Sequence, residues 1–271
     1  MSQRCYGKDE LVVNYHDACI YGRDLALLES TPKTEWLNDA CIHFALTDLQ
    51  VAHDTTDSAS CSGNPLRGRT LFLDPAVVAF LMHQCQDEDD FQDFVAGCRN
   101  FENVHRLVVP INDSLTADHW AIPGAGTHWT LLFMERYHDK NNNNNGIGCA
   151  AAAYHMDSVK GSGNLAVAQA VADKIMKASA GAFGSSLDVV VHDCQGVPTQ
   201  CNGYDCGVHV IAAAQIIAEM IGTCPNDSDR NSVAKYVVEL RKRMGNNSST
   251  FCQNLRQQLA IRIRMLAARS K

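Results

Sequence analysis

A cysteine near the C-terminal third of the chain lies in a setting suited to nucleophilic chemistry. The β-branched stretch 187–192 predicts a buried strand before it, and the apolar run 208–221 predicts a helix after it. Cys206 therefore falls in the first turn of that helix, where unpaired N–H groups and the positive end of the helix dipole favour the thiolate, the attacking species. A backbone N–H of the same turn and the side-chain amide of Gln200 are candidate donors to a developing oxyanion.

A thiol nucleophile needs a neighbouring base, and two His-Trp pairs compete for that role. His119 precedes Ala-Ile-Pro-Gly, which is typical of a loop, whereas His128 opens an apolar stretch that predicts a strand able to hold it rigidly. We therefore predict that His128 is the base. His155, on a later predicted strand, is a weaker candidate that we expect only to fill space.

The alternative for Cys206 is an inert core cysteine, because free cysteines are often buried and this chain contains 12. The surrounding residues argue against that alternative. The stretch resembles the nucleophile motif of the cysteine proteases that process ubiquitin-like modifiers, the SUMO and neddylation proteases. Gln200, Asp205, Cys206 and Gly207 match that motif at the same spacing. The resemblance implies that Cys206 is the catalytic nucleophile and that Gln200 contributes to the oxyanion hole.

Two further segments resemble motifs of the same family. His128-Trp129-Thr-Leu-Leu matches its His-Trp motif, and Asp157, within Tyr-His-Met-Asp-Ser, matches its catalytic aspartate. The resemblance implies that Asp157 holds the imidazole of His128 through the Nδ1–H. If the two strands that carry these residues are antiparallel neighbours, the two side chains meet at one end of the pair.

Trp36-Leu-Asn-Asp39, followed by a predicted amphipathic helix, resembles another motif of the family. From the residues alone, Trp36 is a hydrophobic staple or an ordinary core residue. The resemblance implies instead that Trp36 and Trp129 form the walls of a narrow tunnel for the Gly-Gly tail of a modifier, since larger side chains would clash. Asp39 is a candidate to bind a basic residue just before that diglycine, and its alternative role is to stabilise the helix dipole.

Periodicity and turn residues predict the elements that position these side chains. Strands are expected at 11–15, 106–112, 127–134 and 150–158, and helices at about 39–50, after Asp74-Pro75, after the acidic run 87–90, after Gly161-Ser-Gly-Asn164, at 233–244 and after 246–249. Residues 53–69 predict a surface loop, 121–126 a loop or lid, and the Asn tract 141–145 a disordered hairpin extension. The basic last helix is expected to dock on the core with Arg256, Arg262 and Arg269 off its apolar side.

These elements predict a single α+β catalytic domain over residues 1–271. Its core is expected at about 12–221, with C-terminal helices at 233–269 and a disordered Asn-rich hairpin at 139–148. The resemblance implies a papain-like cysteine protease fold, a central mixed sheet flanked by helices, with the catalytic residues in the order His, Asp, Cys.

Composition excludes several other classes of function. The net charge of −7 argues against a general nucleic-acid binder. No apolar run reaches the roughly 18 residues of a membrane span, and the first ten residues lack the apolar core of a signal peptide. We therefore expect reduced thiols and a cytoplasmic or nuclear protein. No Cys-x-x-Cys pair occurs, so we expect no structural zinc site. We also expect no cofactor.

Together these features predict a cysteine isopeptidase that cleaves after the terminal Gly-Gly of a ubiquitin-like modifier. The Trp-Leu-Asn-Asp motif and the Gly-rich segment before Thr-His-Trp most resemble the deneddylase branch, with a SUMO protease as the alternative. An alternative of another class is a catalytically silent modifier-binding module. The presence of all three predicted triad residues argues against it. The expected partners are the modifier and its conjugates, such as cullins, and the enzyme is expected to be a monomer.

Overall fold

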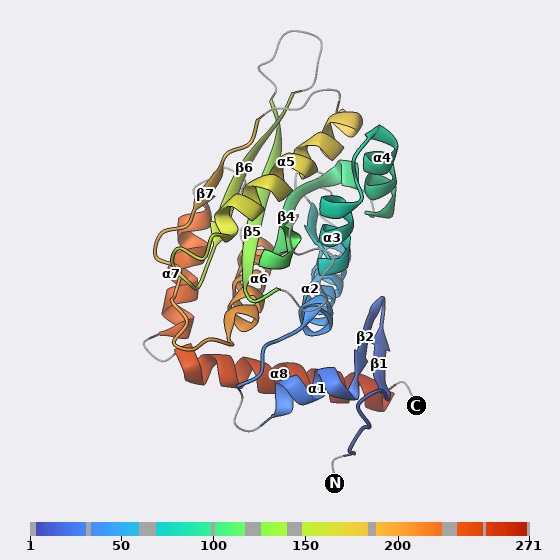
Figure 1. Ribbon diagram of the computed structural model, residues 1–271, viewed down its shortest axis with the longest axis vertical. Coiled ribbons are helices and arrows are strands. Elements are labelled where there is room, and N and C mark those ends of the chain that lie inside the picture. Colours follow the sequence, from blue (N-terminus) through green and yellow to red (C-terminus); the bar gives the residue numbers. More distant parts are fainter. Residues whose placement is uncertain are drawn as a thin grey trace.

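A five-stranded mixed sheet forms the centre of the computed structural model (Figure 1). In spatial order, its strands are β3 (Arg69–Phe72), β4 (Val104–Asn112), β5 (Trp129–Asp139), β6 (Gly148–Met156) and β7 (Val191–Asp193). The two outer pairs are parallel, and the two inner pairs are antiparallel. The structure describes residues 4–30, 34–59, 69–98, 101–116, 126–139, 148–183, 188–223, 232–245 and 248–269. The mixed sheet with flanking helices is the predicted α+β architecture.

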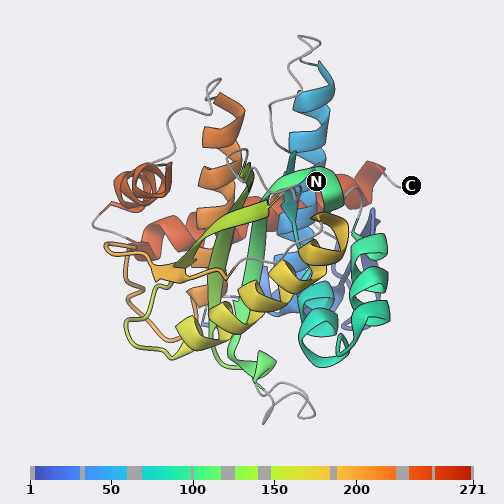
Figure 2. The same cartoon turned by 90° about the horizontal axis from the view of Figure 1, so that it is seen from above.

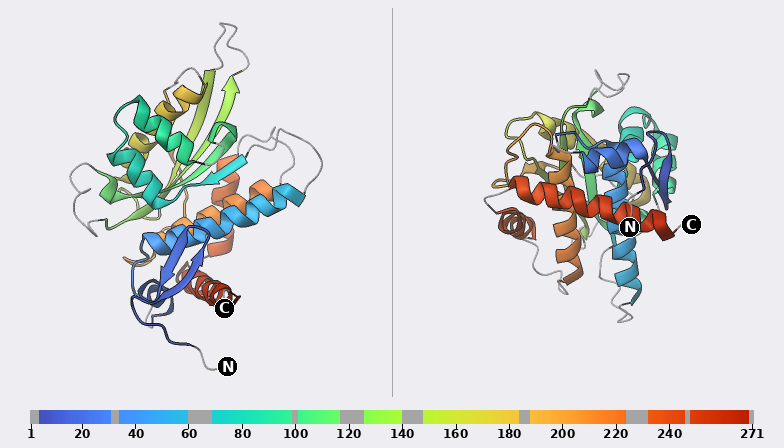
Figure 3. Two further views of the ribbon diagram at one scale, coloured as in Figure 1. Left: turned by 90° about the vertical axis from the view of Figure 1, so that its right-hand side faces the viewer. Right: turned by 90° about the horizontal axis from the view of Figure 1, so that it is seen from below.

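Helices cover both faces of this sheet, as the view from above shows (Figure 2). One face carries α3 (Pro75–His83), α4 (Glu88–Gly97) and α5 (Asn164–Phe183). The other carries α2 (Asp39–Ala59), α6 (Cys206–Thr223) and α7 (Ser232–Met244). The last helix, α8 (Ser248–Arg269), runs beside α1 (Gly22–Glu29) and the hairpin of β1 (Leu11–Tyr15) and β2 (Ala18–Tyr21) (Figure 3).

Side chains alternate along each strand, so the inner strands supply two separate cores. Val108 of β4 and Phe133 of β5 face α2 and α6, whereas Leu107 and Leu132 face the α3 and α5 side. All four side chains are fully buried. Burying a side chain of this size contributes about 1.5–3 kcal/mol to the free energy of unfolding. The apolar strand centres therefore hold a helical layer on each face.

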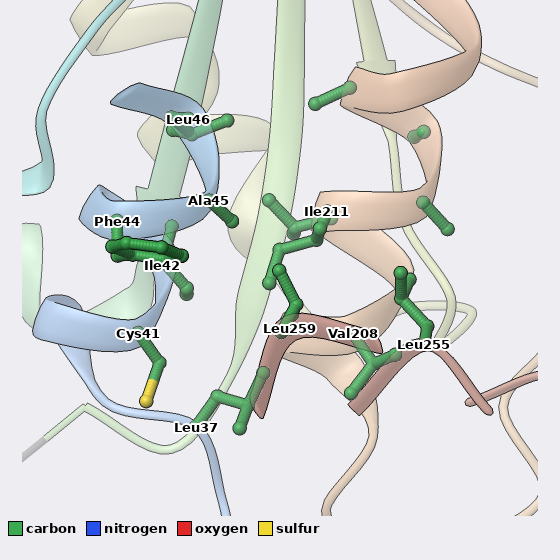
Figure 4. Packing of buried hydrophobic residues seen from close by; sticks show 14 of the residues in the cluster. Leu37, Cys41, Ile42, Phe44, Ala45, Leu46, Val208, Ile211, Leu255 and Leu259 are labelled. Carbon is green, nitrogen blue, oxygen red and sulfur yellow. The ribbon is translucent and has the colours of Figure 1, made fainter. Parts of the chain in front are cut away.

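The helices α2, α6 and α8, which are distant in sequence, pack against one another in the core. Figure 4 shows their side chains packed together: Leu37, Cys41, Ile42, Phe44, Ala45 and Leu46 from or next to α2, Val208 and Ile211 from α6, and Leu255 and Leu259 from α8. The helix that begins at Cys206 is therefore fixed between the sheet, α2 and α8. Docking of the predicted basic helix on the core is confirmed.

The predicted helix starts are confirmed by their N-cap bonds. Side-chain oxygens of Asn38, Asp74 and Asp87 accept backbone N–H groups of the first turns of α2, α3 and α4 at 3.1, 2.9 and 3.1 Å. Each satisfies a donor that has no partner within the helix itself. Local cap chemistry is thus sufficient to place the first turns of these helices.

The loop predicted at 53–69 is wrong over residues 53–59, because α2 continues to Ala59, and residues 60–68 lie outside the described residues. Polar composition favours a loop there, but one side of the helix docks against β3. Gln50 accepts the backbone N–H of Phe72 at 2.9 Å and donates to the carbonyl of Thr70 at 3.2 Å. His53, one turn further, is buried. The helix therefore continues through residues whose polar composition is typical of a loop, because one of its sides packs against the rest of the protein.

The strand predicted at 187–192 is wrong in its extent, since β7 spans only Val191–Asp193 and pairs with β6 alone. Before β7, Val189 is buried but Val190 is 64% exposed, and residues 188–190 are not in a strand. Short edge strands of this kind are common because they limit unwanted pairing. The strands β2 and β3 and the helix α1 were not predicted, because each is too short to show a clear period.

Two predicted features lie outside the described residues, namely most of the lid at 121–126 and the Asn tract at 141–145. Among the helices that the structure describes, none combines the length and the apolar character needed to cross a membrane.

Candidate active site

Cys206 is the first residue of α6, and its side chain is only 2% exposed. Asn202 holds the loop before it. The Oδ1 atom of Asn202 accepts the backbone N–H groups of Tyr204 and Asp205 at 3.1 and 3.0 Å, and its Nδ2 donates to the Asp205 carboxylate at 2.8 Å. The Asp205 carbonyl accepts the N–H of His209, which closes the first turn of α6. The predicted position of Cys206 at a helix start is confirmed.

The sheet register brings His128 and Asp157 together. Leu131 of β5 lies opposite Met156 of β6 in an antiparallel pair, so residues just before β5 and just after β6 occupy the same end of the sheet. The Nε2 atom of His128 lies 2.7 Å from Oδ1 of Asp157. The predicted meeting of the two side chains is confirmed, but the predicted nitrogen is wrong, since Asp157 faces Nε2 rather than Nδ1.

The second nitrogen of the His128 ring serves Cys206. Cys206 is close enough to the ring to raise the pKa of His128 together with Asp157. Because Asp157 faces Nε2, Nδ1 is the ring nitrogen left for the sulfur. Burial by itself would lower the pKa of His128. Hydrogen bonds to Asp157 and Cys206, together with their charges, outweigh burial and raise that pKa to about 9. The site therefore favours an imidazolium between a carboxylate and a sulfur.

The Asp157 carboxylate is held in place by three donors. Its Oδ1 atom accepts from the His128 ring and from the backbone N–H of Val159 at 2.7 Å, and Oδ2 accepts from the Ser162 hydroxyl. Burial alone would raise the pKa of Asp157, but these bonds and the charge of His128 outweigh it and lower that pKa. The carboxylate is therefore kept ionised beside the ring that it orients.

The backbone of His128 is fixed on both sides. Asp113 Oδ1 accepts the N–H of His128 at 3.1 Å, and the side-chain amide of Asn164 donates to the His128 carbonyl at 3.3 Å. Gly126 precedes this point, and a Cβ there would lie 1.9 Å from Oδ1 of Asn112. Close packing against the Asn112 side chain therefore favours a glycine at 126.

Gln200 lies in the loop between β7 and α6, beside the strand end that carries Asp157. Its backbone N–H donates to the Ser158 carbonyl at 3.0 Å, and its side-chain carbonyl accepts from the Ser158 hydroxyl at 2.8 Å. The side-chain amide donates to the Asn202 carbonyl at 2.6 Å. Because a primary amide has two N–H groups, one donor remains for a substrate oxygen.

Both tryptophans that are predicted to form the tunnel lie next to Leu37, Trp129 through a hydrogen bond and Trp36 as its neighbour in the chain. The indole N–H of Trp129 donates to the Leu37 carbonyl at 3.2 Å, and Trp129 is buried. Trp36, the adjacent residue, is 46% exposed, which argues against its alternative role as a core residue. Gly207 packs into the same corner, where a Cβ would lie 3.1 Å from the Cβ of Leu37 and 3.6 Å from Cδ1 of Trp129. A side chain on the residue after Cys206 would therefore require Leu37 to shift.

Asp39 is the first residue of α2 and is exposed. Desolvation and the negative charge of Asp74 nevertheless raise the pKa of its carboxyl. Asp74 in turn lies 3.4 Å from the His43 ring. The carboxylates of Asp39 and Asp74 are thus close enough to interact, a setting that favours an incoming cation.

The other predicted histidines have different outcomes. His155 is buried, and its ring nitrogens lie 3.1 Å from Asp193 Oδ1 and 3.0 Å from Thr130 Oγ1. It therefore joins strands through hydrogen bonds instead of simply filling space. His119 lies outside the described residues. Within the described ranges, no group of three or more His, Cys, Asp or Glu side chains is arranged to hold a metal ion.

Several side chains of the site were not predicted. Ser162 and Asn164 belong to a Gly-Ser-Gly-Asn segment that predicts only a turn. Arg256 was placed off the apolar side of its helix, which is wrong because its side chain is fully buried. His209, in the first turn after Cys206, is 5% exposed, and neither of its ring nitrogens has a hydrogen-bond partner within the described residues. Burial lowers the pKa of His209 to about 4.

A buried thiol at a helix start, beside an imidazole held by a carboxylate, defines a cysteine protease site. Residues 35–254 match the model of the Ulp1 protease family, C-terminal catalytic domain. The chain therefore belongs to the Ulp1 protease family and is a cysteine-type peptidase.

Relatives with similar sequences include "NEDD8-specific protease 1" of Arabidopsis thaliana, which is 29% identical over 78% of this chain and 76% of its own length. "Sentrin-specific protease 8" of Homo sapiens is 28% identical over 78% of this chain and 82% of its own length. Among solved structures, a de-sumoylating protease has a TM-score of 0.60 at 16% identity and covers 93% of this chain and 88% of its own. The C-terminal Ulp1 protease domain in complex with Smt3 has a TM-score of 0.52 at 19% identity, over 95% and 88% of the two chains. These two structures share the fold.

Proposed function

We propose that this peptidase cleaves after the terminal Gly-Gly of a ubiquitin-like modifier and that its preferred modifier is of the neddylation class. The observation that carries the catalytic part is the His128–Asp157 contact of 2.7 Å, made by a ring whose pKa Cys206 also raises. The name of one relative, a NEDD8-specific protease, supports the neddylation class, and that of another, a sentrin-specific protease, supports a ubiquitin-like modifier in general.

In this proposal each residue has one role. The Cys206 thiolate attacks the carbonyl carbon of the last glycine, and the oxyanion accepts hydrogen bonds from the backbone N–H of Cys206 and the free amide N–H of Gln200. The His128 imidazolium then gives its Nδ1 proton to the leaving lysine amine. Water, with its proton taken by the same nitrogen, hydrolyses the thioester and releases the modifier. Asp157 keeps the ring oriented throughout.

Three further residues supply the substrate contacts in this proposal. Trp36 and Trp129 form the walls of a passage for the diglycine, a role supported by the exposed ring of the first and the fixed edge of the second. Asp39 binds a basic residue of the tail. The conjugates from which the modifier is released are proposed to include cullins.

The test is to incubate the protein with each ubiquitin-like modifier carrying a C-terminal electrophile. We expect a covalent adduct with the neddylation modifier and none with the Cys206→Ala variant. An adduct that forms only with SUMO would assign the chain to the alternative specificity. An adduct that persists in Cys206→Ala and is lost in Cys201→Ala would show that the nucleophile is a different thiol.

A further inference from the structure

One side chain of the C-terminal helix reaches the loop that carries Cys206. Arg256 of α8 is fully buried, and its guanidinium forms a fork on the residues just before the nucleophile. Its Nη2 donates to Asp205 Oδ1 at 2.9 Å and to the Tyr204 carbonyl at 3.1 Å, and its Nε donates to the same carboxylate at 3.2 Å. On the other side, Nη1 donates to the Leu27 carbonyl of α1 at 3.2 Å.

The partner of Arg256 is the residue directly before the nucleophile. Asp205 is 4% exposed, and a buried carboxylate next to a thiol disfavours the thiolate through like-charge repulsion. Its ion pair with Arg256 compensates that charge. The Asp205 backbone carbonyl also closes the first turn of α6 through His209, so movement of Asp205 would move the start of the helix. The Arg256–Asp205 contact therefore both neutralises the charge beside Cys206 and fixes the start of α6.

Both anchors of this arrangement lie outside the segment that matches the family. The match spans residues 35–254, whereas Leu27 precedes it and Arg256 follows it. We propose that Arg256 is a positioning residue for catalysis, through which α8 and α1 lock the loop before Cys206 and neutralise Asp205. This proposal rests on the proposed role of Cys206 as nucleophile.

A purely stabilising role predicts different behaviour. Buried ion pairs often add little net stability compared with apolar residues, so the burial of the pair does not by itself indicate a stabilising function. If Arg256 only supported the fold, its replacement would change the free energy of unfolding but not the reactivity of a thiol in the molecules that remain folded. Alkylation of Cys206 as a function of pH separates the two roles.

The test compares two arginines of the same helix. Arg262 also forms an ion pair, but its partner is Asp48 of α2, at 2.7 Å, and its side chain is 36% exposed. We expect Arg256→Met to shift the iodoacetamide alkylation profile of Cys206 to higher pH by about one unit and to lower kcat about tenfold, with KM within about twofold. Arg262→Met is expected to match the wild type in both measurements.

Arg256→Lys tests the geometry of the contact. Lysine keeps the positive charge but lacks the planar fork, so we expect an alkylation profile close to wild type and a kcat between those of wild type and Arg256→Met. A folded Arg256→Met variant whose alkylation profile and kcat equal those of Arg262→Met would overturn the proposal.

If Arg256→Met is unfolded at the assay temperature, the double variant Asp205→Asn/Arg256→Met replaces it, since it leaves no unpaired buried charge. We expect its alkylation profile to be near wild type and its kcat to be several-fold lower. A wild-type kcat in this double variant would contradict the positioning role. Alkylation needs no modifier, so it tests Arg256 independently of the proposed substrate. If the Arg256→Met profile is shifted but the wild-type enzyme cleaves no tested modifier, the role of Arg256 stands and the proposed substrate is rejected.

Discussion

At the scale of single residues, His128 links structure to pH dependence. Its pKa of about 9 lies above the value of about 6.5 of a free histidine, so the charged ring is favoured in the folded state. The stability that this adds is fully present below pH 6.5 and is lost as the pH rises through about 9. The active imidazolium–thiolate pair should follow the same alkaline limit.

We predict that Asp157→Asn keeps the fold and lowers kcat by about two orders of magnitude or more, because the carboxylate that orients and charges the ring is lost. The alkaline limb of kcat/KM, expected near pH 9 in the wild type, should also move to lower pH. Steady-state kinetics from pH 5 to 10 with a fluorogenic modifier substrate measure both effects. An unchanged limb and kcat would assign the orienting role to another carboxylate.

Asp39 belongs to the same scale but concerns specificity. Its raised pKa and the neighbouring Asp74 indicate a site that favours binding of a cation. A charge-assisted hydrogen bond from Asp39 to an arginine of the tail would contribute about 1.5–3 kcal/mol to binding. We predict that Asp39→Ala raises KM for a neddylation-modifier substrate about tenfold and changes KM for a SUMO substrate much less. Equal effects on both substrates, or a large fall in Tm, would limit Asp39 to stabilising the start of α2.

His209 predicts an acid-dependent loss of stability. Its pKa of about 4 in the folded state lies below the usual value of about 6.5, so the unfolded chain binds a proton that the folded chain does not between these pH values. Stability should therefore fall as the pH falls through this window, by up to about 3 kcal/mol. We predict that His209→Phe removes this part of the loss. Urea unfolding of both proteins at pH 7.5 and 4.5 measures it, and parallel losses would show that His209 is not responsible.

At the scale of elements, the turn between β6 and α5 acts as a clamp on the catalytic pair. Gly161 and Gly163 have φ of 74° and 89°, values that other residues rarely adopt, and they flank Ser162. This backbone directs the Ser162 hydroxyl to Asp157 while Asn164 reaches the His128 carbonyl. The segment thus holds both members of the pair from one side.

We predict that Ser162→Ala lowers kcat about five- to tenfold, because Asp157 loses one of its donors. Ser162→Thr keeps the hydroxyl and is the matched control, for which we expect a kcat close to wild type. KM should change little in either variant if Ser162 acts only through Asp157. A Ser162→Ala enzyme with wild-type kcat would show that Val159 and His128 hold the carboxylate without it.

At the scale of the whole molecule, the two sides of the sheet serve different purposes. The side covered by α3, α4 and α5 packs apolar residues against the strands, whereas the other side adds the contacts around Cys206, from α2, α6 and α8. Peptidase chemistry therefore depends on an interface between helices that are far apart in sequence. The N- and C-terminal segments outside the family match complete that interface at Leu27 and Arg256.

The sequence by itself determined the features that depend on short-range physics. Cap residues predicted the starts of α2, α3 and α4, the apolar period predicted the central strands, and the stretch from Gln200 to Gly207 predicted a thiol at a helix start. Each of these follows from hydrogen bonds and side-chain periods within a few residues of the chain.

The tertiary structure alone decided features that depend on remote partners. It showed that Nε2 of His128 faces Asp157, that α2 continues past Gln50 to Ala59, and that Arg256 is buried on Asp205. A charged residue in a helix pattern predicts exposure, because burying a charge is costly unless a partner is present. That partner lies 51 positions earlier in the chain. No local period records such a pairing, so only the folded arrangement reveals it.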